Sequence, residues 1–287
     1  MSEVQDRIPE RFKDRRRDGD TVLRQCQLVE LHLLYVLDEV CRRAGLQYFL
    51  TGGTLIGAMR HGGFIPWDDD IDVAMLRKDY KKFLSVARDL LPADVILQTP
   101  ETLPGTRRAF SKLRDVDSFA LEPSDEVPTS SPMGLSLDVF PMDSCPWGGA
   151  FIHRVSSRVV RFLEAREALS LRKCLRGGVK AVFWSLVGCA LGLAKRMVRF
   201  FWCVVRMVSP RSAICMPIET PWIREKYRKE EVFPLQRMAF EDGMFPVPAD
   251  PVRCLERAYG DWQTPPPENH RFSHLAFMEP LRGVSVD

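Results

Sequence analysis

The chain has 287 residues, of which 45% are hydrophobic, so it is long and apolar enough to bury a sizeable core. Its net charge of +3 is the sum of two regions of opposite charge. Residues 151–211 contain 13 Lys or Arg and 2 Asp or Glu, a net charge of +11, and the remainder therefore carries −8. No Cys-x-x-Cys pair occurs among the eight cysteines, which excludes a zinc knuckle or a thioredoxin-type motif. The charged N-terminus lacks an apolar signal region, so a reducing cytosol is expected.

The first predicted elements follow a charged segment, residues 1–20, which is expected to be a flexible tail. Residues 21–44 place apolar side chains at helical spacing, and Gly45 can end this helix. Residues 46–50 have strand character, and a short helix is expected at 54–60. Further along, strands are expected at 71–75, 109–115 and 136–140, and a helix at 77–91. This order favours an α+β core over residues 21–145, with α/β as the alternative.

The composition changes at residue 146, where a basic and apolar helical insertion is expected to run to residue 217. Its uncharged run at 181–194 is 14 residues long, shorter than the roughly 18–20 that a membrane span needs. Lys195, Arg196 and Arg199 follow at once, so we expect an amphipathic lobe lying on an anionic membrane surface. A lobe packed on the core and a true span are the alternatives, and the apolar content argues against nucleic acid. Residues 218–287 are expected to form a C-terminal lobe around a helix at 250–259.

Four aspartates lie within five positions, directly before and inside the strand predicted at 71–75: Asp68, Asp69, Asp70 and Asp72. Residues i and i+2 of a strand project to the same face, so Asp70 and Asp72 are expected to point together. Neighbouring carboxylates raise each other's pKa, and a divalent ion such as Mg²⁺ relieves that repulsion. A metal site that includes Asp68 is therefore the expectation, and a hydrated acidic loop is the alternative.

The Gly52-Gly53 pair precedes a predicted helix start at Thr54. Glycine lets a ligand approach the backbone closely, and the first N–H groups of a helix carry partial positive charge. We expect a phosphate to be held at Gly52, Gly53 and Thr54. A plain turn is the alternative for such a pair.

Residues 48–75, YFLTGGTLIGAMRHGGFIPWDDDIDVAM, resemble the signature of the LicD family, which includes bacterial phosphocholine transferases and is similar to the fukutin-related ribitol-phosphate transferases. The likeness continues through KDYKKF, SKLRD and GLSLDVFPMD to FEDGMFPVP and YGDWQTPPPENHRFSH near residue 275. The resemblance implies a nucleotidyltransferase-like fold, with a small mixed sheet flanked by helices. It also implies a CDP-activated alcohol as donor and a glycan or glycolipid hydroxyl as acceptor.

Several site residues are carried over by this resemblance. Asp70 and Asp72 match the family's metal pair, Asp68 matches the acid before it, and Asp138 matches a third strand carboxylate. Asp70, Asp72 and Asp138 are therefore the expected catalytic residues, with Mg²⁺ or Mn²⁺ as the metal. Asp138 also fits the role of base for the attacking hydroxyl.

Basic residues near these motifs are candidates for donor binding: Arg60, Lys112, Arg114 and His274. A surface or structural role is the alternative for each. Aromatic pairs, Tyr259 with Trp262 or Trp67 with Trp147, are candidates to surround a quaternary ammonium.

The resulting expectation is a metal-dependent transferase that moves a phosphoalcohol group from a CDP-alcohol to a cell-surface glycan precursor, as in lipopolysaccharide or teichoic acid biosynthesis. A peripheral position on the inner, cytoplasmic face of the plasma membrane fits the basic insertion. One alternative is a sugar-nucleotide glycosyltransferase that uses Asp-Ile-Asp as its metal site. The other is an inactive, membrane-docked binding protein of the same fold.

Overall fold

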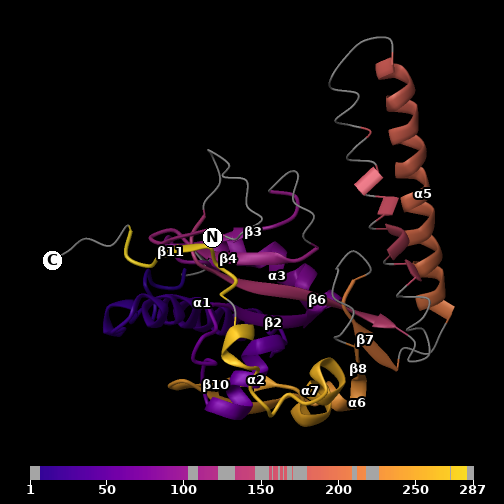
Figure 1. Ribbon diagram of the computed structural model, residues 1–287. Coiled ribbons are helices and arrows are strands. Elements are labelled where there is room, and N and C mark those ends of the chain that lie inside the picture. Colours follow the sequence, from indigo (N-terminus) through magenta and orange to yellow (C-terminus); the bar gives the residue numbers. More distant parts are fainter. Residues whose placement is uncertain are drawn as a thin grey trace, which may run out of the picture. The chain divides into compact units, whose positions relative to one another are not determined.

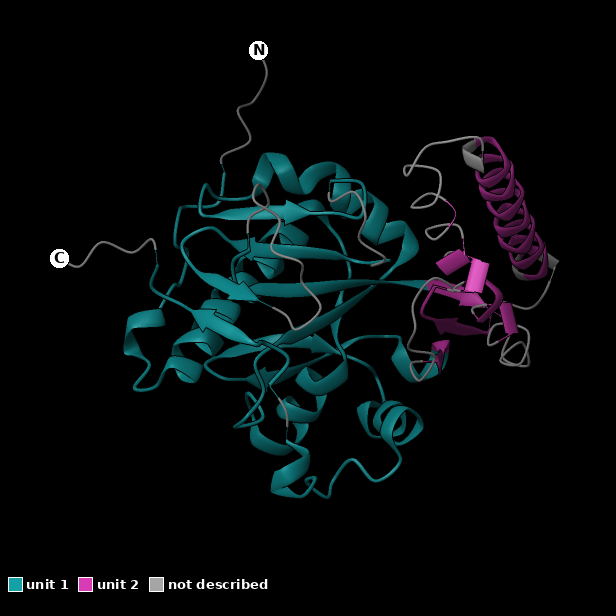
Figure 2. Cartoon of the chain, turned by 45° about the horizontal axis from the view of Figure 1, so that its top comes forward, with its two compact units in different colours: residues 1–142, 230–287 teal, residues 143–229 magenta. Residues whose placement is uncertain are grey.

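The chain folds into two compact units, residues 1–142 with 230–287 and residues 143–229 (Figure 2). The computed structural model describes residues 7–102, 109–121, 133–145, 155–156, 158–160, 162–163, 165–166, 170, 180–208, 212–217, 226–271 and 273–282. The first unit contains both helices and strands (Figure 1), so the expected mixed α+β architecture is confirmed.

The first unit is built on a mixed sheet with the strand order β1, β2, β6, β4, β3. These strands are β1 (Phe49–Leu50), β2 (Ile71–Leu76), β6 (Ser136–Cys145), β4 (Ser111–Asp115) and β3 (Val95–Gln98). Strand β2 pairs with β6 in parallel, and the other pairs in this row are antiparallel. The alternating apolar residues of β2, Ile71 and Val73, are fully buried, which turns Asp72 to the other face of the sheet.

Three helices complete the centre of this unit: α1 (Val22–Ala44), α2 (Gly52–His61) and α3 (Arg77–Leu90). The α1 boundaries follow the sequence signals, because the Thr21 side chain accepts a hydrogen bond from the Arg24 amide and Gly45 adopts a left-handed φ of 63°. Helices α1 and α3 contact each other as well as the strands, so they cover the same face of the sheet. The observed α2 includes the Gly52-Gly53 pair, which the sequence analysis places before the helix.

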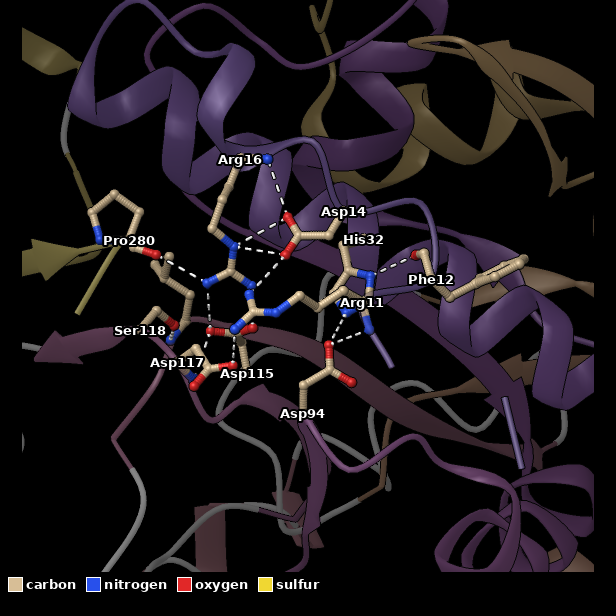
Figure 3. A network of polar contacts seen from close by, with 11 residues as sticks. Arg11, Phe12, Asp14, Arg16, His32, Asp94, Asp115, Asp117, Ser118 and Pro280 are labelled. Carbon is tan, nitrogen blue, oxygen red and sulfur yellow. Dashed lines mark hydrogen bonds and ion pairs between the residues drawn. The ribbon is translucent and has the colours of Figure 1, made fainter. Parts of the chain in front are cut away.

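Residues 7–20, which were expected to belong to a flexible tail, instead pack on the first unit. Ile8 and Arg16 are each 2% exposed. The Arg16 guanidinium donates from Nε to Asp14 at 2.9 Å, from Nη1 to the Pro280 carbonyl at 3.0 Å, and to both carboxylate oxygens of Asp115 on β4 (Figure 3). Asp115 and Pro280 lie far from Arg16 in the sequence, so the charge pattern of the segment by itself did not reveal these two partners.

His32 of α1 also binds the N-terminal segment, through the carbonyl group of Phe12. Its Nδ1 lies 2.6 Å from the Phe12 carbonyl, and its Nε2 lies 3.1 Å from the Asp94 carboxylate (Figure 3). Because both neighbours are acceptors, both ring nitrogens donate, and His32 is an imidazolium cation. Burial opposes this charge, but the hydrogen bonds to Asp94 and to the Phe12 carbonyl, with the charges of Asp94 and Asp14, together outweigh it and raise the pKa of His32 above 6.5.

The C-terminal part of the chain is not a separate lobe, since residues 230–287 belong to the first unit. It begins with α6 (Lys229–Val232) and a hairpin of β9 (Gln236–Phe240) and β10 (Gly243–Val247). The hairpin turn carries Glu241, which accepts hydrogen bonds from Arg24 of α1 and from the Phe64 amide. Helix α7 (Pro251–Tyr259), the 3-10 turn η3 (Glu268–His270) and β11 (Phe277–Glu279) follow, and β11 pairs with β5 (Phe119–Leu121).

The second unit contains the long helix α5 (Lys180–Val208) and the strands β7 (Ala213–Cys215) and β8 (Lys226–Arg228). Strand β7 pairs with β8 and with residues 143–145 of β6. A small core forms around the buried Trp202 of α5, with Cys145, Val160, Ala213 and Cys215. Within the described residues, no helix combines the length and the hydropathy that crossing a membrane requires.

Candidate active site

Strand register places three charged residues in one row on the sheet of the first unit. Asp72 of β2 lies opposite Asp138 of β6, and Asp138 lies opposite Lys112 of β4. The Lys112 Nζ atom is 2.5 Å from Asp138 Oδ1 and 3.3 Å from the Ser136 hydroxyl. The flanking residues Leu137 and Val139 are fully buried in the core, so this row occupies the face turned away from it.

The start of α2 lies against two of the predicted metal ligands. A Cβ atom at Gly52 would collide with the Asp72 carboxylate, and Gly52 also has a left-handed φ of 60°. A Cβ atom at Gly53 would lie 2.7 Å from Asp68 Oδ2. The adjacent Thr54 hydroxyl accepts a hydrogen bond from the Asp72 amide at 2.8 Å. The glycine pair therefore leaves room for the Asp72 and Asp68 carboxylates beside the start of α2.

Asp69, to which the sequence analysis gave no role, joins the acidic loop to the C-terminal segment. Its buried carboxylate accepts hydrogen bonds from the Ser273 hydroxyl and from the amides of His274 and Leu275, both at 2.9 Å. Burial would raise the pKa of Asp69, but these hydrogen bonds and that of the His274 ring outweigh it and lower the pKa below 3.8. Sequence signals could not reveal this role, because the partners lie about 200 positions away.

His274 lies among the acids, where its Nδ1 is 3.2 Å from Asp69 Oδ1 and 3.3 Å from Asp70 Oδ2. The hydrogen bond to Asp69, together with the charge of Asp70, raises the pKa of His274 to about 9. At neutral pH this imidazole is therefore a cation facing the acidic loop.

The ionised forms of Asp68 and Asp70 are unfavourable when both are present, because burial disfavours each charge and the two carboxylates repel each other. Burial and then the charge of Asp70 raise the pKa of Asp68 to about 7. Burial, only partly offset by the His274 charge, raises the pKa of Asp70 to about 6, and the charge of Asp138 adds to this. A cation that approaches these oxygens would stabilise their ionised forms.

Glu30 of α1 is a further carboxyl group of this region that the sequence analysis did not single out. It is 1% exposed, and its Oε2 atom has no hydrogen-bond partner among the described residues. Burial, followed by the charges of Asp70, Asp69 and Asp68, raises the pKa of Glu30 well above 4.5. The only sequence signal for a special role of Glu30 was the position of an acidic residue on the buried side of a helix, three positions after Gln27 and four before Leu34.

Two of the predicted donor-binding residues make other contacts. Arg60 donates from Nη1 to the Trp262 carbonyl at 3.0 Å and from Nε to His61 at 3.0 Å. Arg114 donates to the Gln98 side chain at 2.8 Å and to the Gly134 carbonyl at 2.6 Å, and it is buried. Their side chains therefore bind neighbouring parts of the fold, and their role in donor binding stays a prediction.

The aromatic residues considered for an ammonium site differ in their surroundings. The Arg271 guanidinium already lies over the Trp67 ring, with Cζ 4.2 Å from the centroid. Trp262 is buried, Tyr259 is exposed, and Trp147 lies outside the described residues.

Two groups of side chains in the described regions have the spacing of metal ligands. Ligand atoms of Asp68, Asp69 and His274 lie within 4.8 Å of one another, and so do those of His32, Asp94 and Asp115. The second group already contains the Arg16 guanidinium and an imidazolium, which balance its charge. In the first group, His274 is itself a cation and Asp69 accepts several hydrogen bonds, so the oxygens that fit a hard cation such as Mg²⁺ are those of Asp68, together with those of the neighbouring Asp70. The ligand set of Asp68, Asp70, Asp72 and Asp138 stays a prediction.

These features define an α+β protein with a cluster of acids beside a glycine-start helix and a lysine-paired strand carboxylate. Residues 45–119 match the family described as "LicD/FKTN/FKRP, nucleotidyltransferase domain", so the resemblance that the motifs predicted is confirmed for this part of the chain. Asp138 and His274 lie beyond the matched residues.

The relatives extend this likeness along the chain. Over 263 residues, the chain is 28% identical to the lipopolysaccharide cholinephosphotransferase LicD of Haemophilus influenzae, covering 88% of this chain and 95% of that protein. A stretch of 40 residues is 50% identical to the ribitol 5-phosphate transferase FKRP of Homo sapiens, which is 14% of this chain and 8% of that protein.

Proposed function

We propose that the protein is a metal-dependent transferase that moves a phosphoalcohol group from a CDP-activated donor to a hydroxyl of a cell-surface glycan or glycolipid precursor, with release of CMP. Phosphocholine, ribitol phosphate and glycerol phosphate are the candidate groups. The row of Asp72, Asp138 and Lys112 beside the Gly52-Gly53 helix start carries this proposal. The similarity to a cholinephosphotransferase and a ribitol 5-phosphate transferase supports the same reaction class.

Each group in this arrangement has a task in phosphoryl transfer. Mg²⁺ or Mn²⁺ held by Asp68, Asp70, Asp72 and Asp138 would neutralise the charge of the donor diphosphate. The amides at the start of α2 bind phosphate oxygens, and Lys112 adds a positive charge beside Asp138. Asp138 accepts the proton of the attacking hydroxyl, and the oxygen of that hydroxyl forms the new bond to phosphorus as CMP leaves.

The proposed reaction also implies a cellular location for the protein. Glycan precursors on lipid carriers are presented at the membrane, so the enzyme acts as a cytoplasmic, peripheral protein on the inner face of the plasma membrane. Its partners are then a small CDP-linked donor and a lipid-linked or cell-surface acceptor, with no nucleic acid involved.

A nucleotide-release assay tests the reaction. Purified protein is incubated with Mg²⁺ and a panel of CDP-alcohols and UDP-sugars, and CMP and UDP are measured. We expect CMP release from one CDP-alcohol, and we expect EDTA to abolish it. Asp70→Ala should lower the rate at least about 100-fold, since it removes a predicted metal ligand. Asp89→Asn, which changes an exposed acid of α3, is the matched control and should retain the full rate.

The two alternatives give different results in this assay. UDP release from a sugar nucleotide would identify a glycosyltransferase with an Asp-x-Asp metal site. Donor binding by calorimetry without release of either nucleotide, in the presence of a full range of acceptor extracts, would identify a binding protein.

A further inference from the structure

Helix α5 of the second unit presents a continuous apolar stripe to solvent. Its members are separated by three, four or seven positions, the spacing that aligns side chains on one side of a helix. Leu193 is 60% exposed, Met197 65% and Phe200 70%. The stripe includes Val182, Leu186, Leu193, Met197, Phe200 and Met207.

The opposite side of α5 is the one that packs within the second unit. Trp202 is 3% exposed and lies in the small core with Cys145, Ala213 and Cys215, and Val198 and Val205 pack against it. The apolar stripe is therefore not the packing face of α5. Among the described residues, nothing covers the stripe, and large exposed apolar patches on proteins mark interaction surfaces.

The charge of α5 indicates the chemistry of the partner. The helix contains five basic residues and no acidic residue. Arg196 is exposed, and it borders the stripe because it lies three positions after Leu193 and four before Phe200. An apolar stripe bordered by a basic side chain, on a helix without acidic residues, is the pattern of a helix that lies in the interface of an anionic bilayer. A protein partner that covers an apolar stripe does not require a purely basic helix.

We propose that the α5 stripe docks on the surface of an anionic phospholipid bilayer, with its apolar side chains among the acyl chains and Arg196 at the headgroups. This inference goes beyond the transfer reaction, and it rests on α5 alone. Docking would hold the protein at the surface where a lipid-linked acceptor is presented.

Vesicle co-sedimentation of the full-length protein tests the docking. We expect binding to phosphatidylcholine vesicles that contain phosphatidylserine, and weaker binding to phosphatidylcholine alone. Leu193→Glu with Phe200→Glu should weaken binding at least about tenfold, because it places charge in the acyl region. Arg196→Gln should weaken it about fivefold, the effect of one basic residue near an anionic surface. Met244→Glu, at an exposed methionine of β10, is the matched control and should bind like the parent protein.

A second measurement uses the parent protein and so does not depend on how a variant folds. Cys189 is exposed and lies between Leu186 and Leu193 on the stripe. Its modification by a maleimide, measured by site-resolved mass spectrometry, should slow when anionic vesicles are added. Unchanged labelling together with unchanged sedimentation of the double variant would overturn the proposal.

The stripe has one main competing occupant, a second copy of the chain. Concentration-dependent dimerisation in analytical ultracentrifugation, abolished by the double variant and accompanied by no vesicle binding, would assign the stripe to self-association and refute the bilayer. None of these measurements needs a donor or Mg²⁺. Failure of docking therefore leaves the nucleotide-release result unaffected, and the converse also holds.

Discussion

Asp68, Asp69 and Asp70 are adjacent in the sequence but differ in their electrostatic surroundings. Asp69 accepts several hydrogen bonds and has a lowered pKa, whereas burial and mutual repulsion raise the pKa values of Asp68 and Asp70. Asp69 therefore fixes the loop, whereas a nearby cation would stabilise the ionised forms of Asp68 and Asp70. The amino-acid letters alone do not distinguish these roles.

The raised pKa values predict how metal binding depends on pH. In the unfolded chain, Asp68 and Asp70 titrate near 3.8, and in the folded protein they titrate near 7 and 6. Between pH 3.8 and about 7, the folded state thus binds more protons than the unfolded chain. The metal-free protein therefore loses stability as the pH rises through this range. Metal must displace those protons, so the increase in melting temperature caused by Mg²⁺ should be larger at pH 8 than at pH 5.

Differential scanning fluorimetry with Mg²⁺ or EDTA checks this expectation. Asp70→Asn should remove most of the metal-dependent increase, and Asp89→Asn should keep it. An equal Mg²⁺ effect at both pH values would contradict the idea that protons and metal compete for the same carboxylates.

Glu30 gives a second prediction at this scale. Its folded-state pKa lies well above 4.5, so ionisation of this buried group destabilises the metal-free protein as the pH rises. Glu30→Gln keeps the shape and removes the ionisation. In EDTA, the variant should match the parent protein at pH 5 and exceed it at pH 9, by up to about 1.4 kcal/mol for each pH unit.

Urea unfolding of both proteins across this range measures the difference. Glu256→Gln, at an exposed glutamate of α7, should show no such trend. If Glu30→Gln were less stable at every pH, the Glu30 carboxylate would have to be ionised and paired.

At the scale of elements, the N-terminal segment depends on a few buried ion pairs. Arg16 is 2% exposed, and its partner Asp115 is fully buried. Arg16→Met would leave Asp115 and Asp14 without their cation. Breaking a buried pair in this way costs about 3–5 kcal/mol.

Chemical denaturation should therefore show a large loss of stability for Arg16→Met, and limited proteolysis should cut residues 7–20 faster. Arg15→Met is the matched control: it removes two ion pairs of the same segment, but both are exposed, so its effect should be a small fraction of that loss. Similar losses for both variants would show that burial of the Arg16 network contributes little.

Which elements the sequence could predict depends on where their signals lie. Helices α1, α3 and α7 carry apolar periodicity within themselves, and the Thr21 and Asp250 side chains cap α1 and α7. All three helices were predicted within one or two residues. The short strands β3, β5, β7 and β11 were not predicted, because three or four residues hold too little pattern and these strands exist only by pairing with distant partners. Strand β6 runs five residues beyond its predicted end at Phe140, where it pairs with β7.

At the scale of the whole molecule, the candidate site also combines residues with local sequence signals and residues whose roles depend on distant partners. The Gly52-Gly53 pair, the aspartates and Asp138 were predicted because each lies in a dense local motif. The partnership of Asp138 with Lys112 required the register of β4 on β6, and the roles of Glu30 and Asp69 required contacts across the fold. The division into units also differs from the expected one, because the chain returns to the first unit after residue 229.

The attachment of Asp69 to residues 273–275 has a consequence for biosynthesis. On the ribosome, Asp69 emerges about 200 residues before its partners, and its carboxylate stays solvated until they leave the exit tunnel. The acidic loop therefore acquires its final geometry only after residues 273–275 have left the tunnel. A nascent chain that is shorter than this lacks the hydrogen bonds that fix the Asp69 carboxylate.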